Sequence, residues 1–363
     1  MKDIGSIFPL YEKDLVPFEK TELKSDRIHF SLCREALYAV ARSLNDTNRV
    51  VLMPAYTCDT VYMPFKQLGW KCCYYSVNRD LYANTQSIEN EYKLHHPALF
   101  IIHPYFGQGL SEDEKQTMKE LHDTGCKILV DNTQCIFSEE RLPYVDYYTG
   151  SYRKWFPISD GGFLESTDET ITKPEEENKI FCSLQKGAMY LRGEYFVTEN
   201  EDIKQLSIQL NKAADSHSCG EIIPHRMSDF SETQLLKQDI ESNKKARFDN
   251  YRYLYNNLLK EHLNFASSLD CISSAPLYFP MYLKNRRELQ IYLAKYHIYL
   301  PVIWPIDDEE VLIDDEIGYI YQNILCIPVD QRYDKNDMER IVKLINEFYE
   351  KDEFYEKDCS NRC

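Results

Sequence analysis

Lys154 is the residue whose place in the sequence best suits covalent chemistry. It follows residues 145–149, a β-branched and aromatic run that predicts a strand, and it precedes Pro157, Gly161 and Gly162, which predict a turn. A lysine amine that is buried beside other cations has a lowered pKa, as an amine needs if it is to form a Schiff base with a carbonyl cofactor and then move protons. Taken alone, the Arg-Lys pair at this point favours a solvated turn, because most such pairs lie on surfaces.

A carboxylate and an amide stand upstream of this lysine. Asp131 closes a nearly continuous apolar run, residues 126–130, of the kind that forms a buried strand in a parallel sheet. Open α/β sheets bind ligands at the carboxyl ends of such strands, so Asp131 is placed to pair with the protonated ring nitrogen of a pyridinium. Gln134 follows closely enough to reach an oxygen on the same ring. Equally, Asp131 could simply cap the segment that follows it.

These two motifs together resemble those of a known enzyme family. Asp131-x-x-Gln134, followed about twenty residues later by Ser151-Tyr-Arg-Lys154 and a Gly-Gly turn, is similar to the DegT/DnrJ/EryC1/StrS aminotransferases, often called sugar aminotransferases. Weaker similarities follow in the family's order at residues 30–37, 53–58 and 225–229. The resemblance implies an α/β, fold-type I transferase that depends on pyridoxal phosphate (PLP), with a mostly parallel central sheet, helices on both faces and a smaller C-terminal α+β domain.

The order of predicted elements agrees with this architecture. From residue 50 to residue 130, short apolar runs alternate with helical patterns, which is typical of a mostly parallel sheet. We expect a large PLP-binding domain over residues 1–245, including an N-terminal lead-in, and a small α+β domain over residues 246–363 with a disordered tail from residue 357. A single helix over residues 230–259 is expected to join the two domains.

The resemblance also implies roles for individual residues. Lys154 would be the catalytic residue and would hold PLP as an internal aldimine. The residues expected to bind the cofactor are Cys33, Arg34, Glu35, Tyr56, Cys58, Asp131, Gln134 and Ser151. The turn before the first long helix would present backbone N–H groups to the phosphate, and Arg34 would add positive charge. An ordinary amphipathic helix with an exposed Arg34 would have the same pattern.

The sequence departs from the family pattern around the cofactor. Cys33 stands where a glycine is usual in the phosphate turn. Cys58 occupies the position of the aromatic residue that stacks on the cofactor ring, with Tyr56 two residues earlier. Pro224 replaces an asparagine that reaches the phosphate bound by the partner subunit, so His225 or Arg226 would have to make such a contact.

Further residues are candidates for contact with the substrate, namely His103, Arg226, Trp304 and Arg332. His103 follows a predicted strand and suits a proton donor, although a lone histidine at a strand end is more often structural. Arg332 lies at a strand-helix junction, where its guanidinium could bind a carboxylate through two hydrogen bonds, and Trp304 could wall the pocket. Ordinary packing explains both residues equally well.

The resemblance also implies the reaction, namely the transfer of an amino group from glutamate to a keto sugar, possibly nucleotide-linked, by a ping-pong mechanism in a homodimer. One alternative is a PLP enzyme of another type, such as a lyase or a dehydratase. Dehydratases of the family carry histidine in place of the lysine, which counts against that branch; a desulfurase would need a mobile cysteine, for which Cys219 is a candidate. The other alternative is a non-catalytic relative, because fold and motif do not guarantee turnover.

Composition and charge narrow the remaining possibilities. The chain has 363 residues, of which 43% are hydrophobic, as in a packed globular protein. Its 42 basic and 59 acidic residues give a net charge of -17, which disfavours nucleic acid and anionic membranes as partners. We find neither a signal-peptide pattern nor an apolar run that could span a bilayer, and expect a cytoplasmic protein. The twelve cysteines include no paired Cys-x-x-Cys, so we expect reduced thiols and no metal site.

Overall fold

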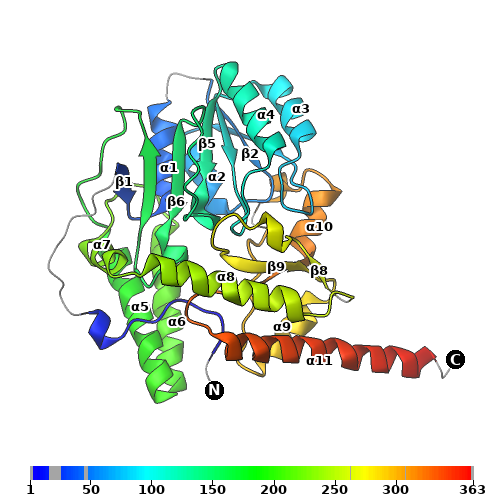
Figure 1. The fold of residues 1–363 in the computed structure, drawn as a ribbon. Coiled ribbons are helices and arrows are strands. Elements are labelled where there is room, and N and C mark those ends of the chain that lie inside the picture. Colours follow the sequence, from blue (N-terminus) through cyan, green and yellow to red (C-terminus); the bar gives the residue numbers. More distant parts are fainter. Residues whose placement is uncertain (1–2, 16–25, 45–47, 262, 307, 361–363) are drawn as a thin grey trace.

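The computed structural model describes residues 3–15, 26–44, 48–261, 263–306 and 308–360, with side chains as far as residue 350. Parts of the predicted lead-in, residues 1–2 and 16–25, and the last residues of the predicted tail, 361–363, lie outside the described residues. The described chain forms a seven-stranded sheet in the order β1-β7-β6-β5-β4-β2-β3 and a three-stranded sheet in the order β10-β9-β8 (Figure 1).

The middle of the large sheet is a run of parallel strands. In spatial order they are β3 (Lys71–Tyr75), β2 (Val50–Pro54), β4 (Leu99–Ile102), β5 (Lys127–Asp131) and β6 (Tyr147–Ser151). Most of their side chains are buried, which explains why the sequence shows apolar runs and not an apolar-polar alternation. Because the strands are parallel, all their carboxyl ends lie at the same edge of the sheet.

The chain changes direction across the sheet at β2. Strand β3 pairs with one side of β2 and β4 pairs with the other. The connections that leave β2 and β4 therefore diverge, and the crevice between them is the place where open α/β sheets bind ligands.

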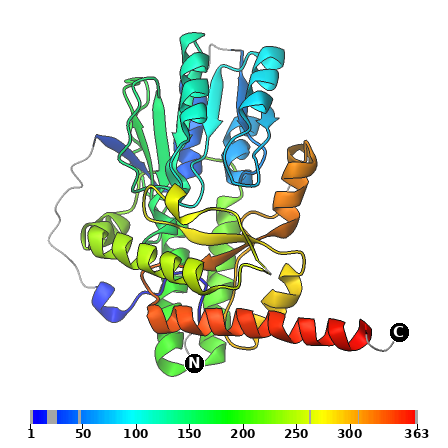
Figure 2. The same cartoon turned by 45° about the vertical axis from the view of Figure 1, so that its right-hand side comes forward.

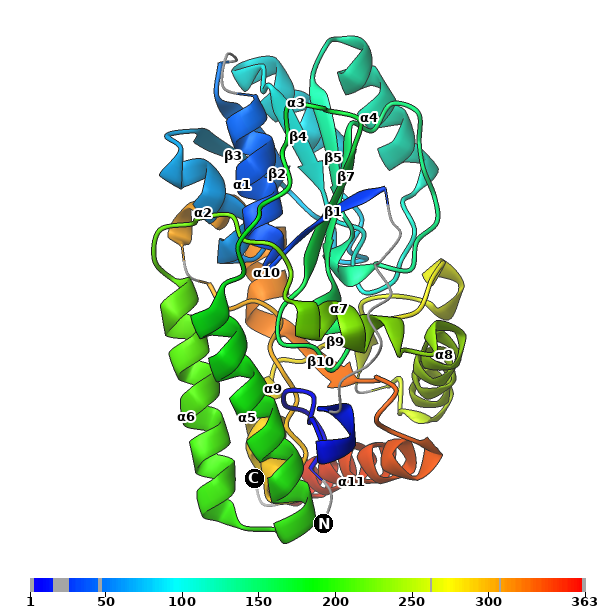
Figure 3. The same cartoon turned by 90° about the vertical axis from the view of Figure 1, so that its left-hand side faces the viewer.

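Helices cover both faces of this sheet (Figure 3). The helices are α1 (Cys33–Ser43) and α2 (Asp59–Gln67), which pack together on one face, and α3 (Thr85–His95) and α4 (Glu112–Asp123), which pack together on the other. Helix α4 begins with a capping box, in which Ser111 and Glu114 satisfy each other's backbone N–H groups. The predicted α/β architecture, with a mostly parallel sheet between helices, is confirmed.

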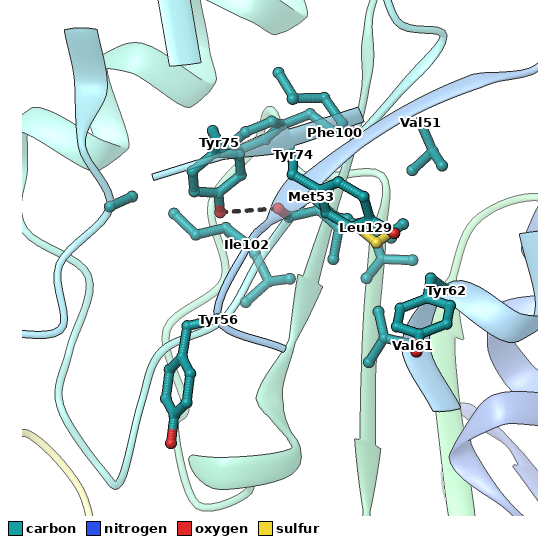
Figure 4. Packing of buried hydrophobic residues seen from close by; sticks show 14 of the residues in the cluster. Val51, Met53, Tyr56, Val61, Tyr62, Tyr74, Tyr75, Phe100, Ile102 and Leu129 are labelled. Carbon is teal, nitrogen blue, oxygen red and sulfur yellow. Dashed lines mark hydrogen bonds between the residues drawn. The ribbon is translucent and has the colours of Figure 1, made fainter. Parts of the chain in front are cut away.

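The main hydrophobic core fills the space around β2, β3, β4 and β5 (Figure 4). Aromatic side chains are prominent in it, and the ring of Tyr75 stacks on Phe100 with centroids 5.3 Å apart. The Tyr75 hydroxyl donates a hydrogen bond of 3.0 Å to the carbonyl of Ile101. The polar tip of this fully buried tyrosine is therefore satisfied inside the core.

Two antiparallel strands extend the sheet beyond β6. They are β7 (Gly162–Ser166) and the edge strand β1 (Arg27–Phe30). A Cβ atom at residue 162 would lie 2.5 Å from the backbone nitrogen of Cys33, and Gly161 has φ +136°, so this turn requires its two glycines. The short connection from β6 to β7, which carries Lys154, is thereby held against the start of α1.

The C-terminal part of the chain forms a smaller antiparallel sheet (Figure 2). Its strands are β8 (Asn264–Phe265), β9 (Tyr278–Tyr282) and β10 (Ile324–Pro328), and its helices are α8 (Ile240–Asn257), α9 (Arg286–Ala294), α10 (Asp315–Asn323) and α11 (Lys335–Ser360). A second hydrophobic cluster joins α8, α9 and α11 to this sheet. Short 3-10 helices are η1 (Glu12–Asp14), η2 (Asn132–Gln134), η3 (Tyr152–Lys154), η4 (Leu269–Cys271) and η5 (Glu309–Val311).

The helix predicted over residues 230–259 is in fact two helices, α7 (Asp229–Leu236) and α8. The carboxylate of Asp239 accepts a hydrogen bond from the Ser242 N–H group and so begins a new helix where the sequence analysis expected continuity. Helix α11 is described as far as Ser360, and the disordered tail expected from residue 357 stays a prediction. Within the described ranges, no helix is both long and apolar enough to cross a membrane.

A helical hairpin and the N-terminal segment complete the structure. The hairpin consists of α5 (Lys179–Thr198) and α6 (Glu201–Ser218), which lie side by side (Figure 3). Residues 3–10 run between this hairpin and the small sheet. The carboxylate of Asp3 is buried against Arg192 of α5 and Lys204 of α6, at 2.8 and 3.3 Å, while Ile4 exchanges backbone hydrogen bonds with residues 297 and 299.

Candidate active site

Most of the predicted site residues gather at the carboxyl ends of the parallel strands. They line a small cavity of about 90 Å³, here called the inner cavity. Its walls include Cys33, Arg34, Cys58, His103, Asp131, Gln134, Ser151, Lys154 and Trp304. Apart from Trp304, which lies between α9 and η5, these residues end or follow β2, β4, β5 and β6 or begin α1, so the edge of the sheet predicted from the apolar runs is the edge at which they meet.

One end of the inner cavity is a chain of hydrogen-bonding side chains. His103 Nε2 lies 2.9 Å from Thr57 Oγ1, which joins the loop after β4 to the loop after β2. On the other side of the ring, His103 Nδ1 lies 3.5 Å from Asp131 Oδ2. Asp131 Oδ1 accepts the Thr133 N–H group at 2.9 Å. We call this group of residues, Thr57, His103 and Asp131, the carboxylate end.

The carboxylate end lies inside the protein. His103 and Asp131 are both about 4% exposed. Burial lowers the pKa of His103, and the neighbouring Asp131 only partly opposes that shift. His103 is therefore neutral near pH 7, and the Asp131 carboxylate is left as the buried negative charge of this end.

The N-terminus of α1 closes another side of the inner cavity. The N-cap residue Leu32 offers no side-chain acceptor, so the N–H groups of the first turn have no side-chain cap. Arg34 stands at this helix end, and its guanidinium donates to the Ser218 carbonyl of α6 at 2.8 Å. Ser151 and Gln134 add polar groups nearby, and Gln134 is fixed because its Oε1 accepts the Phe106 N–H group at 2.9 Å. These groups together can bind an anion.

Lys154 ends the short helix η3 and lies across the cavity from Asp131. The Lys154 side chain is exposed to solvent at the cavities that it borders, although the surrounding protein partly desolvates its amine. This desolvation, and secondly the positive charge of Arg153, lower the pKa of Lys154. The sequence analysis expected a lowered pKa from burial beside a cation; the cation is present, but the side chain is exposed.

The backbone that carries Lys154 is tied to the C-terminal part of the chain. The carbonyl of Trp155 accepts a hydrogen bond from Gln331 Nε2 at 2.7 Å and one from Arg247 Nη2 at 3.3 Å. The Trp155 indole, which is fully buried, donates to the Thr133 carbonyl at 2.9 Å. The lysine loop is thereby positioned relative to the loop that follows Asp131.

A second support comes from the segment at residues 225–229. Asp160, which is fully buried, accepts hydrogen bonds from the backbone N–H of Ser228 at 2.9 Å and from its hydroxyl at 2.6 Å. In this structure, Ser228 thus anchors the turn that follows Lys154.

Some of the predicted residues lie elsewhere. Tyr56 is fully buried behind Trp304, with ring centroids 5.0 Å apart, and its hydroxyl donates to the Ile303 carbonyl. Glu35 contacts His225 and borders a wide surface groove. Arg226 borders the same groove and pairs with Glu177 and Asp229, both at 2.9 Å. None of these side chains lines the inner cavity.

Arg332 borders a different space, an outer cavity of about 500 Å³ on the far side of Lys154. Its guanidinium binds the Asp330 carboxylate at 2.7 and 2.8 Å, so the two-pronged contact expected with a substrate is made with a residue of the chain itself. Arg153 and Lys154 line both cavities. The opposite wall of the outer cavity carries Gln185 of α5 and Asn211 and Asp215 of α6.

Sequence reasoning missed Arg153, Gln185 and Asp215 as parts of the site. The adjacency of Arg153 to the lysine was the available signal. Nothing in the local sequence marked the two helix residues, because their position depends on how the hairpin packs.

Comparisons with known proteins identify the fold. No family model and no curated protein sequence matches the chain. Among solved structures, the Helicobacter pylori aminotransferase PseC, involved in pseudoaminic acid biosynthesis, has a TM-score of 0.67 at 10% identity over 96% of this chain and 100% of that one. A DegT DnrJ EryC1 StrS aminotransferase from Brucella abortus has a TM-score of 0.63 at 16% identity, over 89% and 85% of the two chains. A putative sugar aminotransferase from Streptococcus pneumoniae, in its PMP form, has a TM-score of 0.66 at 12% identity over 91% and 88%. The chain has the fold of these proteins, as the motifs predicted.

Proposed function

We propose that the chain is a PLP-dependent aminotransferase that moves an amino group from glutamate to a keto sugar. One observation carries this proposal. Lys154, whose pKa is lowered, and the buried carboxylate of Asp131 line the same inner cavity. The structural neighbours supply the reaction type, since those described above are aminotransferases.

The residues of the inner cavity fit this cofactor chemically. The uncapped start of α1, Arg34 and Ser151 suit a phosphate, and the buried Asp131 carboxylate suits a protonated ring nitrogen. Lys154 lines the same cavity, and its amine suits an aldehyde. When bound, PLP supplies an electron-withdrawing ring that stabilises negative charge on the substrate carbon.

Lys154 would perform two tasks. Its amine would hold the aldehyde of the cofactor, and Lys154 Nζ would accept a proton from the α-carbon of the amino donor. A lowered pKa favours this second task, because a general base must be unprotonated at the working pH. Donor and acceptor would bind in turn, which predicts ping-pong kinetics.

The carboxylate end would keep the charge pattern fixed during the reaction. Asp131 holds its negative charge in a buried position where charge interactions are strong. The neutral His103, fixed between Thr57 and Asp131, orients that carboxylate and excludes water from it.

The homodimer is part of the same proposal. A wide groove of about 1010 Å³ meets the inner cavity at Leu32 and Arg34, and Ile180 and Ile223 are exposed along it. A second copy of the chain bound in this groove would cover these apolar side chains, next to the N-terminus of α1 where the phosphate would bind. The cytoplasmic location remains a prediction from the sequence.

The first test is an absorbance spectrum of the purified protein with PLP, recorded before and after L-glutamate is added. We expect a visible band that shifts on addition of glutamate, and neither the band nor transamination in Lys154→Ala. Lys245→Ala, which removes an exposed lysine of α8, is the matched control and should behave as wild type. A band that ignores glutamate would indicate another PLP reaction. No band in excess cofactor would indicate a non-catalytic relative, and turnover by Lys154→Ala would contradict the mechanism.

A further inference from the structure

Arg153 is a cation without a counter-ion between the two cavities. Among the described residues, no hydrogen bond or ion pair reaches its guanidinium, which contacts only the face of the Phe181 ring, at 5.5 Å from the centroid. The Arg153 side chain is only partly exposed, so its guanidinium loses part of its hydration without a counter-ion to replace it. Burial accordingly lowers the pKa of Arg153. A guanidinium without a counter-ion favours the binding of an anionic ligand.

A glutamine with a fixed side chain also lines the outer cavity. Gln185 is 3% exposed, its Nε2 donates to Asn211 Oδ1 at 3.1 Å, and Asn211 in turn donates to Asp215 at 3.0 Å. Gln185 Oε1 has no hydrogen-bond partner and is itself buried. These residues form a fixed part of the cavity lining, and the group that can reach a ligand is the Arg153 guanidinium.

Asp215 is the charged group of this wall that most affects Arg153. Its charge partly opposes the lowered pKa of Arg153, yet the two residues do not form an ion pair. Arg332, on the same cavity, is already paired with Asp330. Arg153 is thus a guanidinium of this cavity that remains open to a ligand, beside the amine of Lys154.

We propose that Arg153 binds the carboxylate of a substrate in the outer cavity. This inference rests on the proposed function, because it places the substrate beside Lys154. The carboxylate could belong to the amino donor or to a sugar acid. The alternative is that Arg153 binds the phosphate group of the cofactor, together with Arg34.

The test is calorimetric titration of the PLP-loaded protein with ligands that cannot be transaminated. Glutarate represents the amino donor, D-glucuronate a sugar acid, and inorganic phosphate the alternative. We expect wild type to bind one of the two carboxylates and Arg153→Gln to bind it about tenfold to hundredfold more weakly, the loss expected for a charged hydrogen bond. Arg153→Lys should fall between them, since lysine keeps the charge but not the two-pronged geometry.

Arg252→Gln is the matched control, because it removes the same charge from an exposed site on α8. Thermal melting establishes that each variant is folded.

Several outcomes overturn the proposal. They are that wild type binds neither carboxylate, that Arg153→Gln binds as wild type does, or that phosphate alone responds to the substitution. If the protein takes up no PLP, the proposed function fails, but the same titrations on the purified chain still decide the role of Arg153.

Discussion

The two ends of the inner cavity are built in different ways. At the carboxylate end, Thr57, His103 and Asp131 bond to one another and are closed off from solvent. At the other end, no hydrogen bond or ion pair within the described residues reaches the Lys154 amine or the Arg153 guanidinium, and only the backbone beside them is held. Groups that must keep one charge throughout a reaction can be bonded in advance. Groups that must exchange partners have to be left open, and their supports act on the main chain.

The largest effect should come from removing the charge of the carboxylate end. Asp131→Asn keeps the shape of the side chain but not its negative charge, and we expect the rate of the glutamate half-reaction to fall by at least about a hundredfold. Stopped-flow absorbance measures this rate. Asp146→Asn is the control, because Asp146 binds Lys127 at the opposite end of β5. An Asp131→Asn rate within tenfold of wild type would show that this end is not catalytic.

The support of the lysine loop can be broken without changing a residue that lines the inner cavity. Arg247 is fully buried, and its guanidinium donates to the carbonyls of Trp155, Pro276 and Leu277. Arg247→Met leaves these carbonyls without that donor, so the free energy of unfolding should fall by about 3 kcal/mol. Urea denaturation measures it, with Arg252→Met on the exposed side of α8 as the control. Equal stability of the two variants would contradict this account of the loop.

A milder change tests whether the carboxylate end works as a unit. Thr57→Val removes the hydroxyl that meets His103 Nε2 and keeps the side-chain volume. We expect the half-reaction to slow about fivefold, which corresponds to the loss of about 1 kcal/mol from one neutral hydrogen bond. If Thr57→Val proved as fast as wild type, the orientation of His103 would not depend on Thr57.

The smallest effect concerns pH. Because burial lowers the pKa of His103, its folded form stays neutral while an unfolded histidine gains a proton near pH 6.5. The unfolded state thus binds more protons below about pH 6.5, and the stability contributed by a neutral His103 is lost as the pH falls. NMR of labelled histidine, assigned with His103→Gln, should show no titration of His103 near pH 6.5. A midpoint at or above 6.5 would contradict the buried, neutral ring.

The sequence predicted those parts of the site that follow from local pattern. Apolar runs located the strands, and Asp131 and Lys154 stand at the strand ends where parallel pairing brings them together. Arg332 shows the limit of prediction from local pattern. Its sequence position suits contact with a substrate carboxylate, but in the structure its guanidinium pairs with Asp330.

Other parts depend on packing between distant segments. The wall formed by Gln185 and Asp215 exists because two helices dock against the lysine loop, and no spacing along the chain encodes that docking. The break between α7 and α8 depends on a single cap, Asp239, which resembles any other aspartate in an acidic chain.

The N-terminal segment has a consequence for the order of events during synthesis. Asp3 and Ile4 emerge from the ribosome long before their partners, Arg192, Lys204 and residues 297–299, have been made. For most of translation, this stretch has no place to bind. Part of the chain that is made early is thus among the last to dock, and its docking joins the hairpin to the small sheet only when both exist.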